Sequence, residues 1–246
     1  KMIGRIKARL RRKREYKAFL EQMNQFRASA AKTKSRFPLR EEDIYACLHD
    51  NTSYTPFDRH YVFHVAWACR TVKKVNPKVH IDFSSSLYFC TTVSAFVPTK
   101  FYDFRPAKLN LAGLDSLQGD LTKISFPDNS VESLSCLHTI EHVGLGRYGD
   151  PIDYDGDVKA INELKRVVKP GGSLLFVTPV GQPRIQYNAH RIYAFEQVKE
   201  LFSGFELREF SLVPDSDEVG GLIQDADPGL VAQQKYGCGC FWFVKK

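Results

Sequence analysis

The stretch VHIDFSSSLYF, residues 79–89, joins a strand-like pattern to an unusual turn. Apolar residues alternate up to Asp82, and the chain then enters a turn made of Ser84, Ser85 and Ser86. In a nucleotide-binding fold the ligand lies at such a strand end, on a turn that is usually rich in glycine. The residues around this stretch must show whether the rest of such a fold is present.

Strand-like and helix-like patterns alternate after this stretch. Helices are predicted at 157–168 and 194–202. The alternation predicts βαβ units, and hence an α/β fold with a doubly wound, mainly parallel, Rossmann-like sheet covered on both faces. No helix pattern separates the last two strands, so one of them is expected to run antiparallel. The strands are predicted at 79–83, 100–104, 132–137, 173–178, 205–212 and 239–244.

The positive charge of the chain is confined to an N-terminal arm. Residues 1–36 hold 13 Lys and Arg against two acidic residues, a net charge of +11, whereas the remainder carries −4. A mildly acidic body argues against a nucleic-acid-binding groove, so no nucleic-acid partner is predicted. Apolar residues such as Ile6, Leu10, Leu20 and Phe26 recur at roughly helical spacing, which predicts a basic amphipathic helix. This helix could lie on an anionic membrane surface, or pack on the body or on a second subunit.

A helical lead-in or lid is expected at 37–77, before the main domain predicted at 78–246. The acidic residues at 41–43 are typical of a helix start, and a second apolar stripe follows and stops at Pro77. No apolar run approaches the roughly 20 residues needed to span a bilayer. The domain organisation is therefore predicted as an arm, a helical lead-in and one α/β domain.

Candidate metal ligands are few. His60 and His64 lie four residues apart on one helix face and could bind a metal with a third ligand, but no partner motif is visible. Core or lid positions are therefore preferred for both. Cys238 and Cys240 have C-x-C spacing, and the six cysteines are scattered through apolar segments, which indicates reduced thiols in a cytoplasmic protein. No metal site is predicted.

Polar side chains follow the ends of the first predicted strands. Asp103 follows Asp82 by 21 residues, about the interval at which an acidic residue reaches the ribose hydroxyls in dinucleotide-binding folds. A carboxylate suits this task because it can accept hydrogen bonds from both hydroxyls. Asp120 lies in a later loop, and His138 and His142 leave the next strand. Because ligands bind at the carboxyl ends of the strands in such sheets, these residues are expected to surround one site.

The chain resembles the class I S-adenosylmethionine-dependent methyltransferases in three blocks. They read GDLTKISFPDNSVESLSCLHTIEHV (119–143), AINELKRVVKPGGSLLFVTPV (160–180) and YAFEQVKELFSGFELREFSLV (193–213). Their order, their spacing and the Lys-Pro-Gly-Gly turn before a strand match that superfamily over about residues 78–246. The resemblance implies S-adenosylmethionine as cofactor and S-adenosylhomocysteine as product.

Two further segments resemble a bacterial group described only as a domain of unknown function. They are GRYGDPIDYDGD (146–157) and NAHRIY (188–193). Members of that group often accompany surface-polysaccharide biosynthesis, so the resemblance implies O-methylation of a saccharide or lipid-linked saccharide, at the inner face of a membrane if the arm binds there. The alternative is a non-catalytic binding or scaffolding relative.

The resemblance assigns cofactor-binding roles residue by residue. Asp82 would support the turn that faces the methionine moiety, and Asp103 would hold the ribose. Asp120 and Leu121 would face the adenine. His138 would line the methionine side.

The chain departs from the superfamily at the turn itself. The superfamily reads Asp/Glu-x-Gly-x-Gly, whereas this chain has Ser84 and Ser86 at the glycine positions. Glycine tolerates φ > 0 and lets the backbone approach the ligand closely. A serine forced to φ > 0 costs on the order of 1 kcal/mol, although its Oγ could hydrogen-bond the amino-acid end of the cofactor. A functional, a weakened and a lost cofactor site all stay open.

Several residues are candidates for catalysis and acceptor binding. A sugar hydroxyl is a poor nucleophile, so a base is expected, and His142 beside Glu141 follows the strand where acceptor and cofactor would meet. The alternative is that Glu141 caps or orients a helix while His142 packs. His190 is a second candidate base, or else it orients its loop. The predicted acceptor-binding residues are Arg147, Tyr148, Asp153, Asp155 and Arg191.

Two of these assignments have structural alternatives. Arg191 could grip a carboxylate or phosphate, or it could pair with a nearby acid. Asp150, Asp153, Asp155 and Asp157 lie close together and could hold Mg²⁺ or Ca²⁺, but the calcium-loop pattern is not matched. Contact with the acceptor, or helix capping by Asp157, are the alternatives for this loop.

Overall fold

The computed structural model describes residues 2–32, 36–216 and 220–246. The chain forms two units, Lys1–Pro56 and Phe57–Lys246. The boundary expected at 77/78 thus lies at 56/57, because the helix before Pro77 belongs to the second unit. No helix in the described ranges is long and apolar enough to cross a membrane.

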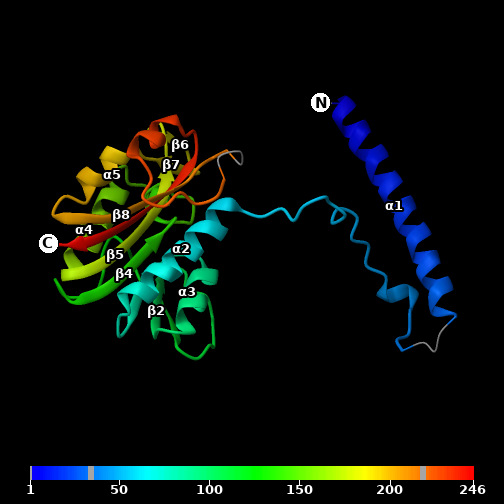
Figure 1. The fold of residues 1–246 in the computed structure, drawn as a ribbon, viewed down its shortest axis with the longest axis horizontal. Coiled ribbons are helices and arrows are strands. Elements are labelled where there is room, and N and C mark those ends of the chain that lie inside the picture. The colour runs from blue at the N-terminus through cyan, green and yellow to red at the C-terminus, as the bar shows by residue number, and fades with distance from the viewer. Residues whose placement is uncertain (1, 33–35, 217–219) are drawn as a thin grey trace. The chain divides into compact units, whose positions relative to one another are not determined.

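The first unit is built around helix α1, Met2–Ala30 (Figure 1). The predicted helix is present, but its apolar residues do not form a single stripe. At 100° per residue, Ile6 and Leu10 project from a different side of the helix than Tyr16 and Met23 do. Residues 1 and 33–35 of the predicted arm lie outside the described residues.

The acidic residues after the arm form only a short turn. Element η1, Glu41–Asp43, is one 3₁₀ turn, and no helix or strand follows it before Pro56. The prediction that a helix begins at these acidic residues is therefore wrong. Arg27 of α1 donates a hydrogen bond to Glu41, which connects the helix to this turn.

The second unit contains one seven-stranded sheet with the order β3-β2-β1-β4-β5-β9-β8. The first five of these strands run parallel, and β9 is antiparallel to both β5 and β8. This confirms the mainly parallel, doubly wound sheet and its one reversed strand. The strands are β1 (His80–Phe83), β2 (Thr99–Asp103), β3 (Leu114–Gln118), β4 (Val131–Leu137), β5 (Val168–Val180), β8 (Phe205–Val213) and β9 (Gly237–Lys245).

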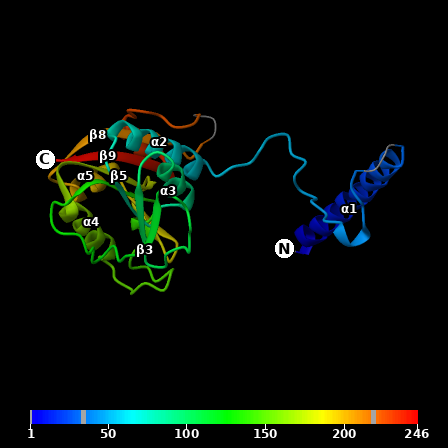
Figure 2. The same cartoon turned by 90° about the horizontal axis from the view of Figure 1, so that it is seen from below.

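Helices cover both faces of the sheet. Helices α2 (Arg59–Val75) and α3 (Leu87–Ser94) pack on one face, and α4 (Gly156–Val167) and α5 (Phe195–Leu201) on the other. Figure 2 shows α2 on one side of β9 and α4 and α5 on the other. Side chains alternate along the central strand β5, so that Leu175 and Val177 join the first layer, whereas Leu174 and Phe176 join the second.

The sequence of α2 explains why this helix belongs to the sheet. Asp58 caps its start by accepting a hydrogen bond from the Tyr61 N–H at 3.1 Å, and Asn76 ends it in the left-handed conformation, directly before Pro77. Its apolar face, which includes the buried Trp67, packs against the sheet. The first turn of α2, which carries His60 and Tyr61, is thereby placed beside the ends of the strands.

A small hairpin completes the site edge. Strands β6 (Arg184–Gln186) and β7 (His190–Ile192) form a separate two-stranded sheet. An isolated β-bridge between Val180, the last residue of β5, and Tyr193, directly after β7, holds this hairpin beside β5. The 3₁₀ segments η2 (Ile140–His142) and η4 (Pro228–Gln233) lie after β4 and before β9. Because η2 contacts α4, β5 and β7, the residues that leave β4 are held by three elements.

Candidate functional site

A cavity of about 670 Å³ opens at the carboxyl ends of β1, β2, β3 and β4. This is the edge at which a doubly wound sheet is expected to bind a ligand, where the strand order changes direction between β1 and β4. The structure brings together here every predicted cofactor-binding residue except Asp82. These lining residues are Ser84, Ser86, Asp103, Asp120, Leu121 and His138.

The serine turn adopts the conformation that glycine normally provides. Ser84 has a φ of +56°, a region that residues with a Cβ atom rarely occupy. Its backbone is held from two sides. The Ser84 N–H donates to the Tyr102 carbonyl at 2.8 Å, and the Ser84 carbonyl accepts from the Thr139 hydroxyl at 2.9 Å. The turn is therefore fixed in the open, glycine-like form by β2 and by the segment after β4.

The other two serines support the same turn. The Ser85 hydroxyl accepts a hydrogen bond from the Leu137 N–H at 3.0 Å. Ser86 has an ordinary φ of −65° and caps α3 by accepting from the Phe89 N–H at 3.3 Å. The first turn of α3 thus begins at the cavity wall, where helix N–H groups favour negatively charged ligand groups.

Asp82 acts from inside the core. It is completely buried, accepts a hydrogen bond from the Ser85 N–H at 3.2 Å and is hydrogen-bonded to the Ser135 hydroxyl. Burial raises the pKa of Asp82 to about 7. The side chain therefore supports the turn, in line with the supporting role expected from the sequence, and does not line the cavity.

Asp103 and Asp120 each present a carboxylate that is anchored on one side. Asp103 Oδ1 accepts from the Arg105 N–H at 2.7 Å. Asp120 Oδ1 accepts from the Thr122 N–H at 2.8 Å and from the Thr122 hydroxyl at 2.7 Å. No hydrogen bond between described residues uses either Oδ2 atom. Both carboxylates can therefore accept further hydrogen bonds from a ligand in the cavity, as ribose hydroxyls and an adenine amine would supply.

A second cavity, of about 700 Å³, shares four lining residues with the first. It is formed by the start of α2, by η2 and the loop after it, and by the β6–β7 hairpin and the segment before β9. Ligands bound in the two cavities could therefore both contact these four shared side chains. The shared residues are Tyr61, His138, His142 and Tyr148.

His138 stands between the two cavities. It has a φ of +56° and is only 7% exposed, and its Nδ1 lies 2.8 Å from Glu141 Oε1. Burial by itself lowers the pKa of His138, but the Cys238 sulfur and the Glu141 carboxylate outweigh burial and raise it to about 10. The Glu141 carboxylate is 1% exposed and therefore acts through its histidine neighbours.

His142 has the geometry of a base. Its Nδ1 lies 2.6 Å from the Ala189 carbonyl, which requires the proton on Nδ1 and leaves the Nε2 lone pair available. Nε2 is 3.9 Å from Glu141 Oε1, close enough for this carboxylate to stabilise a protonated ring. Packing of His142, the structural alternative, is incomplete, because its side chain keeps 15% exposure and lines both cavities.

His190, Arg147 and Tyr148 surround the second cavity. His190 Nε2 contacts Gln186 Oε1 at 2.6 Å, and burial lowers the pKa of His190, which favours its neutral form. Arg147 donates to the Ala189 carbonyl at 3.1 Å and lies 5.0 Å from the centre of the Tyr148 ring. His190 lines only the second cavity, so it is farther from the cofactor side than His142.

The acidic loop is held together by its own hydrogen bonds. Asp150 accepts from the N–H groups of Gly144 at 2.8 Å and Gly146 at 3.3 Å. Asp153 accepts from Lys159 Nζ at 2.5 Å and lines the first cavity, whereas Asp155 lines neither of the two cavities. Within the described ranges, these aspartates do not gather into a group that could hold a metal ion.

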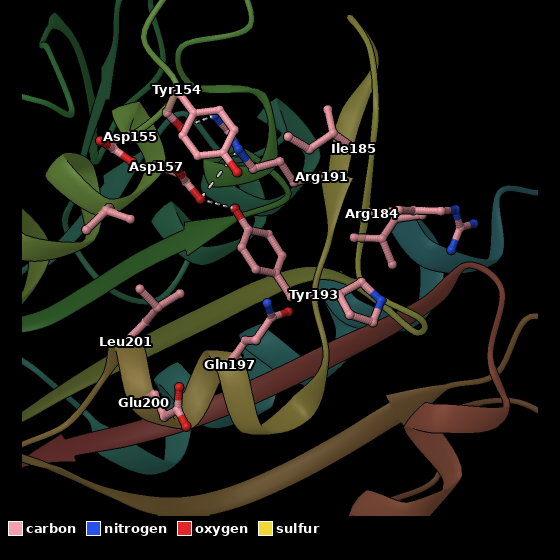
Figure 3. Close-up of a pocket in the computed structure, with 13 residues that line it drawn as sticks. Tyr154, Asp155, Asp157, Arg184, Ile185, Arg191, Tyr193, Gln197, Glu200 and Leu201 are labelled. Carbon is pink, nitrogen blue, oxygen red and sulfur yellow. Dashed lines mark hydrogen bonds and ion pairs between the residues drawn. The ribbon is translucent and has the colours of Figure 1, made fainter.

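Arg191 and Asp157 are two buried residues at the wall of a separate pocket (Figure 3). Arg191 is 6% exposed and donates to the carbonyls of Val143 at 2.6 Å and Tyr154 at 2.9 Å. Asp157 lies 3.5 Å from Arg191 Nε and accepts from the Tyr193 hydroxyl at 2.7 Å. Arg191 thus pairs with an acid, and it lines neither of the two cavities above but a separate one, together with Asp155 and Tyr193. Asp157 does not cap α4, which starts one residue earlier without a side-chain cap.

Some lining residues escaped the sequence prediction. Tyr61, in the first turn of α2, lines both cavities. Thr139 and Lys159 line the first cavity, and Tyr236 the second. In the sequence of α2, only the histidines His60 and His64 indicated that this helix could contribute to a site. The other residues of that site lie far away in the chain, so the sequence could not show which of the two histidines takes part.

Comparisons with known proteins place the fold. No curated protein matches the chain. A family model described as Caenorhabditis protein of unknown function, DUF268, matches residues 125–217, which is less than half of the chain. This match includes the segments GRYGDPIDYDGD (146–157) and NAHRIY (188–193) but names no activity.

Solved structures are similar over most of the chain. The YcgJ protein from Bacillus subtilis is 14% identical with a TM-score of 0.50, covering 74% of this chain and 98% of its own. A putative methyltransferase from Haloferax volcanii, solved with the Trm112 methyltransferase activator, is 16% identical with a TM-score of 0.51. The match covers 76% of this chain and 90% of the chain in that structure. The MccD protein is 14% identical with a TM-score of 0.51, covering 74% and 96%. At these identities the likeness is one of fold, and that fold is the Rossmann-like fold of S-adenosylmethionine-dependent methyltransferases.

Proposed function

We propose that the chain transfers a methyl group from S-adenosylmethionine to an oxygen of a polar acceptor, namely a saccharide hydroxyl. The observation that carries this proposal is the junction of the two cavities. One cavity has the carboxylates that a nucleoside requires, the other has polar and aromatic walls, and His142 lines both. A base at this junction would meet both a bound cofactor and an acceptor, which supports the proposal.

The first cavity supplies the cofactor-binding groups. Asp103 would hold the ribose hydroxyls, and Asp120 with the buried Leu121 would hold the adenine. Ser84 keeps the backbone in the glycine-like conformation, which supports a functional turn over a lost one. When bound, S-adenosylmethionine supplies an electrophilic methyl group on its sulfonium.

The second cavity supports an oxygen acceptor. A hydroxyl needs a base to become a good nucleophile, and such a base contributes about 10²–10⁴-fold to the rate. His142 would take the hydroxyl proton at Nε2 as the oxygen–methyl bond forms and the sulfur–methyl bond breaks. Glu141 would stabilise the resulting charge as a positioning residue. Arg147, Tyr148 and His190 would contact the acceptor, and their mixture of rings and hydrogen-bonding groups suits a sugar.

The strong positive charge of the arm supports a membrane-associated acceptor. Residues 1–36 carry a net charge of +11, and each basic residue near an anionic lipid surface contributes about 1 kcal/mol. A lipid-linked saccharide at the inner face of a membrane would then be the acceptor, in a surface-polysaccharide pathway. Self-association through the arm is the competing role.

Calorimetric titration with S-adenosylmethionine and S-adenosylhomocysteine tests the cofactor half of the proposal. We expect micromolar binding by the wild type, its loss in Asp103→Ala, and normal binding in Asp115→Ala, an exposed aspartate of β3 outside both cavities. His142→Gln should bind the cofactor normally but transfer labelled methyl groups to lipid-linked saccharides about 10²–10⁴-fold more slowly. No heat, and no thermal stabilisation by millimolar ligand, would instead identify a non-catalytic scaffold.

A further inference from the structure

Three residues from distant parts of the chain meet between the second cavity and the sheet. His60 comes from the first turn of α2, His138 follows β4, and Cys238 lies in β9. One ring nitrogen of each histidine and the sulfur of Cys238 all lie within 4.8 Å of one another. Within the described ranges this is the only group of its kind among His, Cys, Asp and Glu side chains.

The hydrogen bonds of the two histidines leave one nitrogen on each ring for a metal ion, which would displace any proton held there. His60 Nε2 lies 3.2 Å from the Tyr236 carbonyl, so the Nε2 proton is donated outward and Nδ1 is left as an acceptor. His138 Nδ1 lies 2.8 Å from Glu141 Oε1, so in the neutral ring Nε2 is left as an acceptor. Metal-binding histidines characteristically donate their other N–H to a carbonyl or a carboxylate in this way, which fixes the ring and its tautomer.

His138 also has a buried ring nitrogen without a hydrogen-bond partner among the described residues. Its side chain is more than nine-tenths buried, and Nε2 makes no hydrogen bond to any other described residue. Buried polar atoms in folded proteins are almost always paired, so such an atom indicates a binding partner. The fully buried Cys238 sulfur lies within 4.8 Å of a ring nitrogen of His138.

We propose that His60, His138 and Cys238 bind a zinc ion. Two imidazole nitrogens and one thiolate form a donor set that suits zinc and excludes Mg²⁺ and Ca²⁺, which prefer oxygen ligands. Zinc–nitrogen bonds of about 2.0–2.1 Å and a zinc–sulfur bond of about 2.3 Å require the three atoms to close by roughly 1 Å. His60 is half-buried at the start of α2, where its side chain can make this adjustment.

The fourth position of the ion would face the acceptor cavity. His60 and His138 both line that cavity, whereas Cys238 approaches from the sheet beneath them. A site with three protein ligands and one open position is typical of catalytic zinc, because the open position takes water or substrate. Zinc binding itself does not depend on methyl transfer, so the two proposals can fail separately.

Zinc binding to the purified full chain tests the proposal. After removal of metal with a chelator, zinc affinity and stoichiometry are measured by competition with a chromophoric chelator. We expect one tight zinc ion per chain, and affinity reduced more than about 100-fold in His60→Gln and in Cys238→Ser, because loss of even an outer hydrogen-bond partner typically costs 10–100-fold. Glu141→Gln, which removes such an outer partner, should bind about 10–100-fold more weakly.

Cys240→Ser is the matched control. Cys240 is a buried thiol two residues farther along β9, with its sulfur 3.9 Å from that of Cys238, but it lies outside the ligand group. It should retain wild-type zinc affinity within about twofold. Co²⁺ added in place of zinc should give a sulfur-to-cobalt charge-transfer band that Cys238→Ser abolishes and Cys240→Ser keeps.

Folding is checked independently by circular dichroism of each metal-free variant. His60→Gln changes a half-buried residue in the first helical turn and should fold normally, so it remains informative if Cys238→Ser does not fold. Equal zinc affinity in the wild type and His60→Gln would overturn the proposal. Absence of zinc binding by the folded wild type at micromolar zinc would overturn it as well.

Discussion

At the scale of single residues, Ser84 shows how a turn can keep a glycine conformation without glycine. Its left-handed backbone costs on the order of 1 kcal/mol relative to glycine. The flanking hydrogen bonds from Ser84 N–H to Tyr102 and from Thr139 to the Ser84 carbonyl offset this cost. The Ser84 hydroxyl donates only a long hydrogen bond of 3.3 Å to the Tyr102 carbonyl. The side chain thus contributes little to the turn.

Replacing the two flanking serines with glycine should have opposite effects. Ser84→Gly removes the left-handed strain, so we expect the free energy of unfolding to rise by about 0.5–1 kcal/mol, with cofactor affinity unchanged or higher. Ser86→Gly removes a helix cap at an ordinary φ and should lower it by a few tenths to about 1 kcal/mol. Urea denaturation measures both. Equal destabilisation by the two substitutions would contradict the role given to the Ser84 conformation.

The residues of the site were predictable to the extent that strand ends determine them. Asp103 lies at the end of a predicted strand, so the topology of a parallel sheet brings it to the site. Asp120 follows β3, which the sequence did not predict, and only the family resemblance assigned it to the site. The contacts of Arg191 were not predictable in this way, because the direction of its side chain depends on the register of the β6–β7 hairpin. In that register the side chain points into the protein, toward Asp157. The partnership of His60 with Cys238 depends on how α2 packs across β9, which no local pattern records.

At the scale of elements, β1 and β4 are joined by a buried polar chain. His80 Nδ1 lies 2.8 Å from the Ser133 hydroxyl and Nε2 lies 2.8 Å from the Ser135 hydroxyl, which is in turn bonded to Asp82. Burial lowers the pKa of His80 to about 3 and raises that of Asp82 to about 7. These four side chains can therefore all be uncharged below neutral pH and still be hydrogen-bonded to one another.

The raised pKa of Asp82 predicts a pH dependence of stability. Between about pH 4 and pH 7 the folded protein retains a proton that the unfolded chain, with a carboxyl pKa of 3.8, has lost. The contribution of Asp82 to the free energy of unfolding therefore falls as pH rises through this window, by at most about 1.4 kcal/mol per pH unit. Asp82→Asn should remove this slope, because an amide can donate to Ser135 and accept from Ser85 without titrating.

Denaturation curves of the wild type and Asp82→Asn between pH 4.5 and pH 8 measure this effect, because this range covers most of the window of about pH 4–7 set by the two pKa values. The difference in unfolding free energy between the two proteins should shift in favour of the variant as pH rises. Asp115→Asn, at an exposed position of β3, serves as the control and should follow the wild-type curve. Parallel curves for Asp82→Asn and the wild type would show that Asp82 does not titrate in this range.

The elements themselves were mostly predictable, and the misses have physical reasons. Long apolar strands such as β4 and β5 are buried on both faces, and this burial gives them a clear signal. The edge strand β3, with the sequence LDSLQ, has only Leu114 buried, so it resembles a loop in sequence. The acidic residues at 41–43 have helix-start composition but no buried apolar face to sustain a helix, and they end as one turn.

At the scale of the whole molecule, the two units have separate roles. The apolar core clusters of the described residues lie entirely within Phe57–Lys246, and the excess positive charge lies within the first 36 residues. The second unit should therefore fold without the first. The first unit, whose large apolar side chains on α1 such as Leu10 and Phe26 are exposed, has its surface available for a partner or a lipid surface.

Deletion of residues 1–56 tests this division. We expect the melting temperature of the remaining unit and its affinity for S-adenosylmethionine to stay within about 2 °C and twofold of the full chain, because no core residue is removed. Sedimentation of the full chain with vesicles that contain anionic lipid should be strong at low salt, weak at high salt, and absent after the deletion. Vesicles of neutral lipid should sediment little of either protein, since charge supplies most of the attraction.

The outcome of the vesicle measurement separates the two roles of the arm. A chain in which Arg11, Arg12 and Arg14 are replaced by glutamine keeps the apolar residues of α1 but loses three charges. Salt-sensitive membrane binding should weaken by about 3 kcal/mol in this variant, because each basic residue contributes about 1 kcal/mol. Vesicle binding that survives the deletion of residues 1–56 would contradict the membrane role. If the full chain does not bind vesicles but sediments as an oligomer, and deletion of residues 1–56 makes it monomeric, the arm serves self-association.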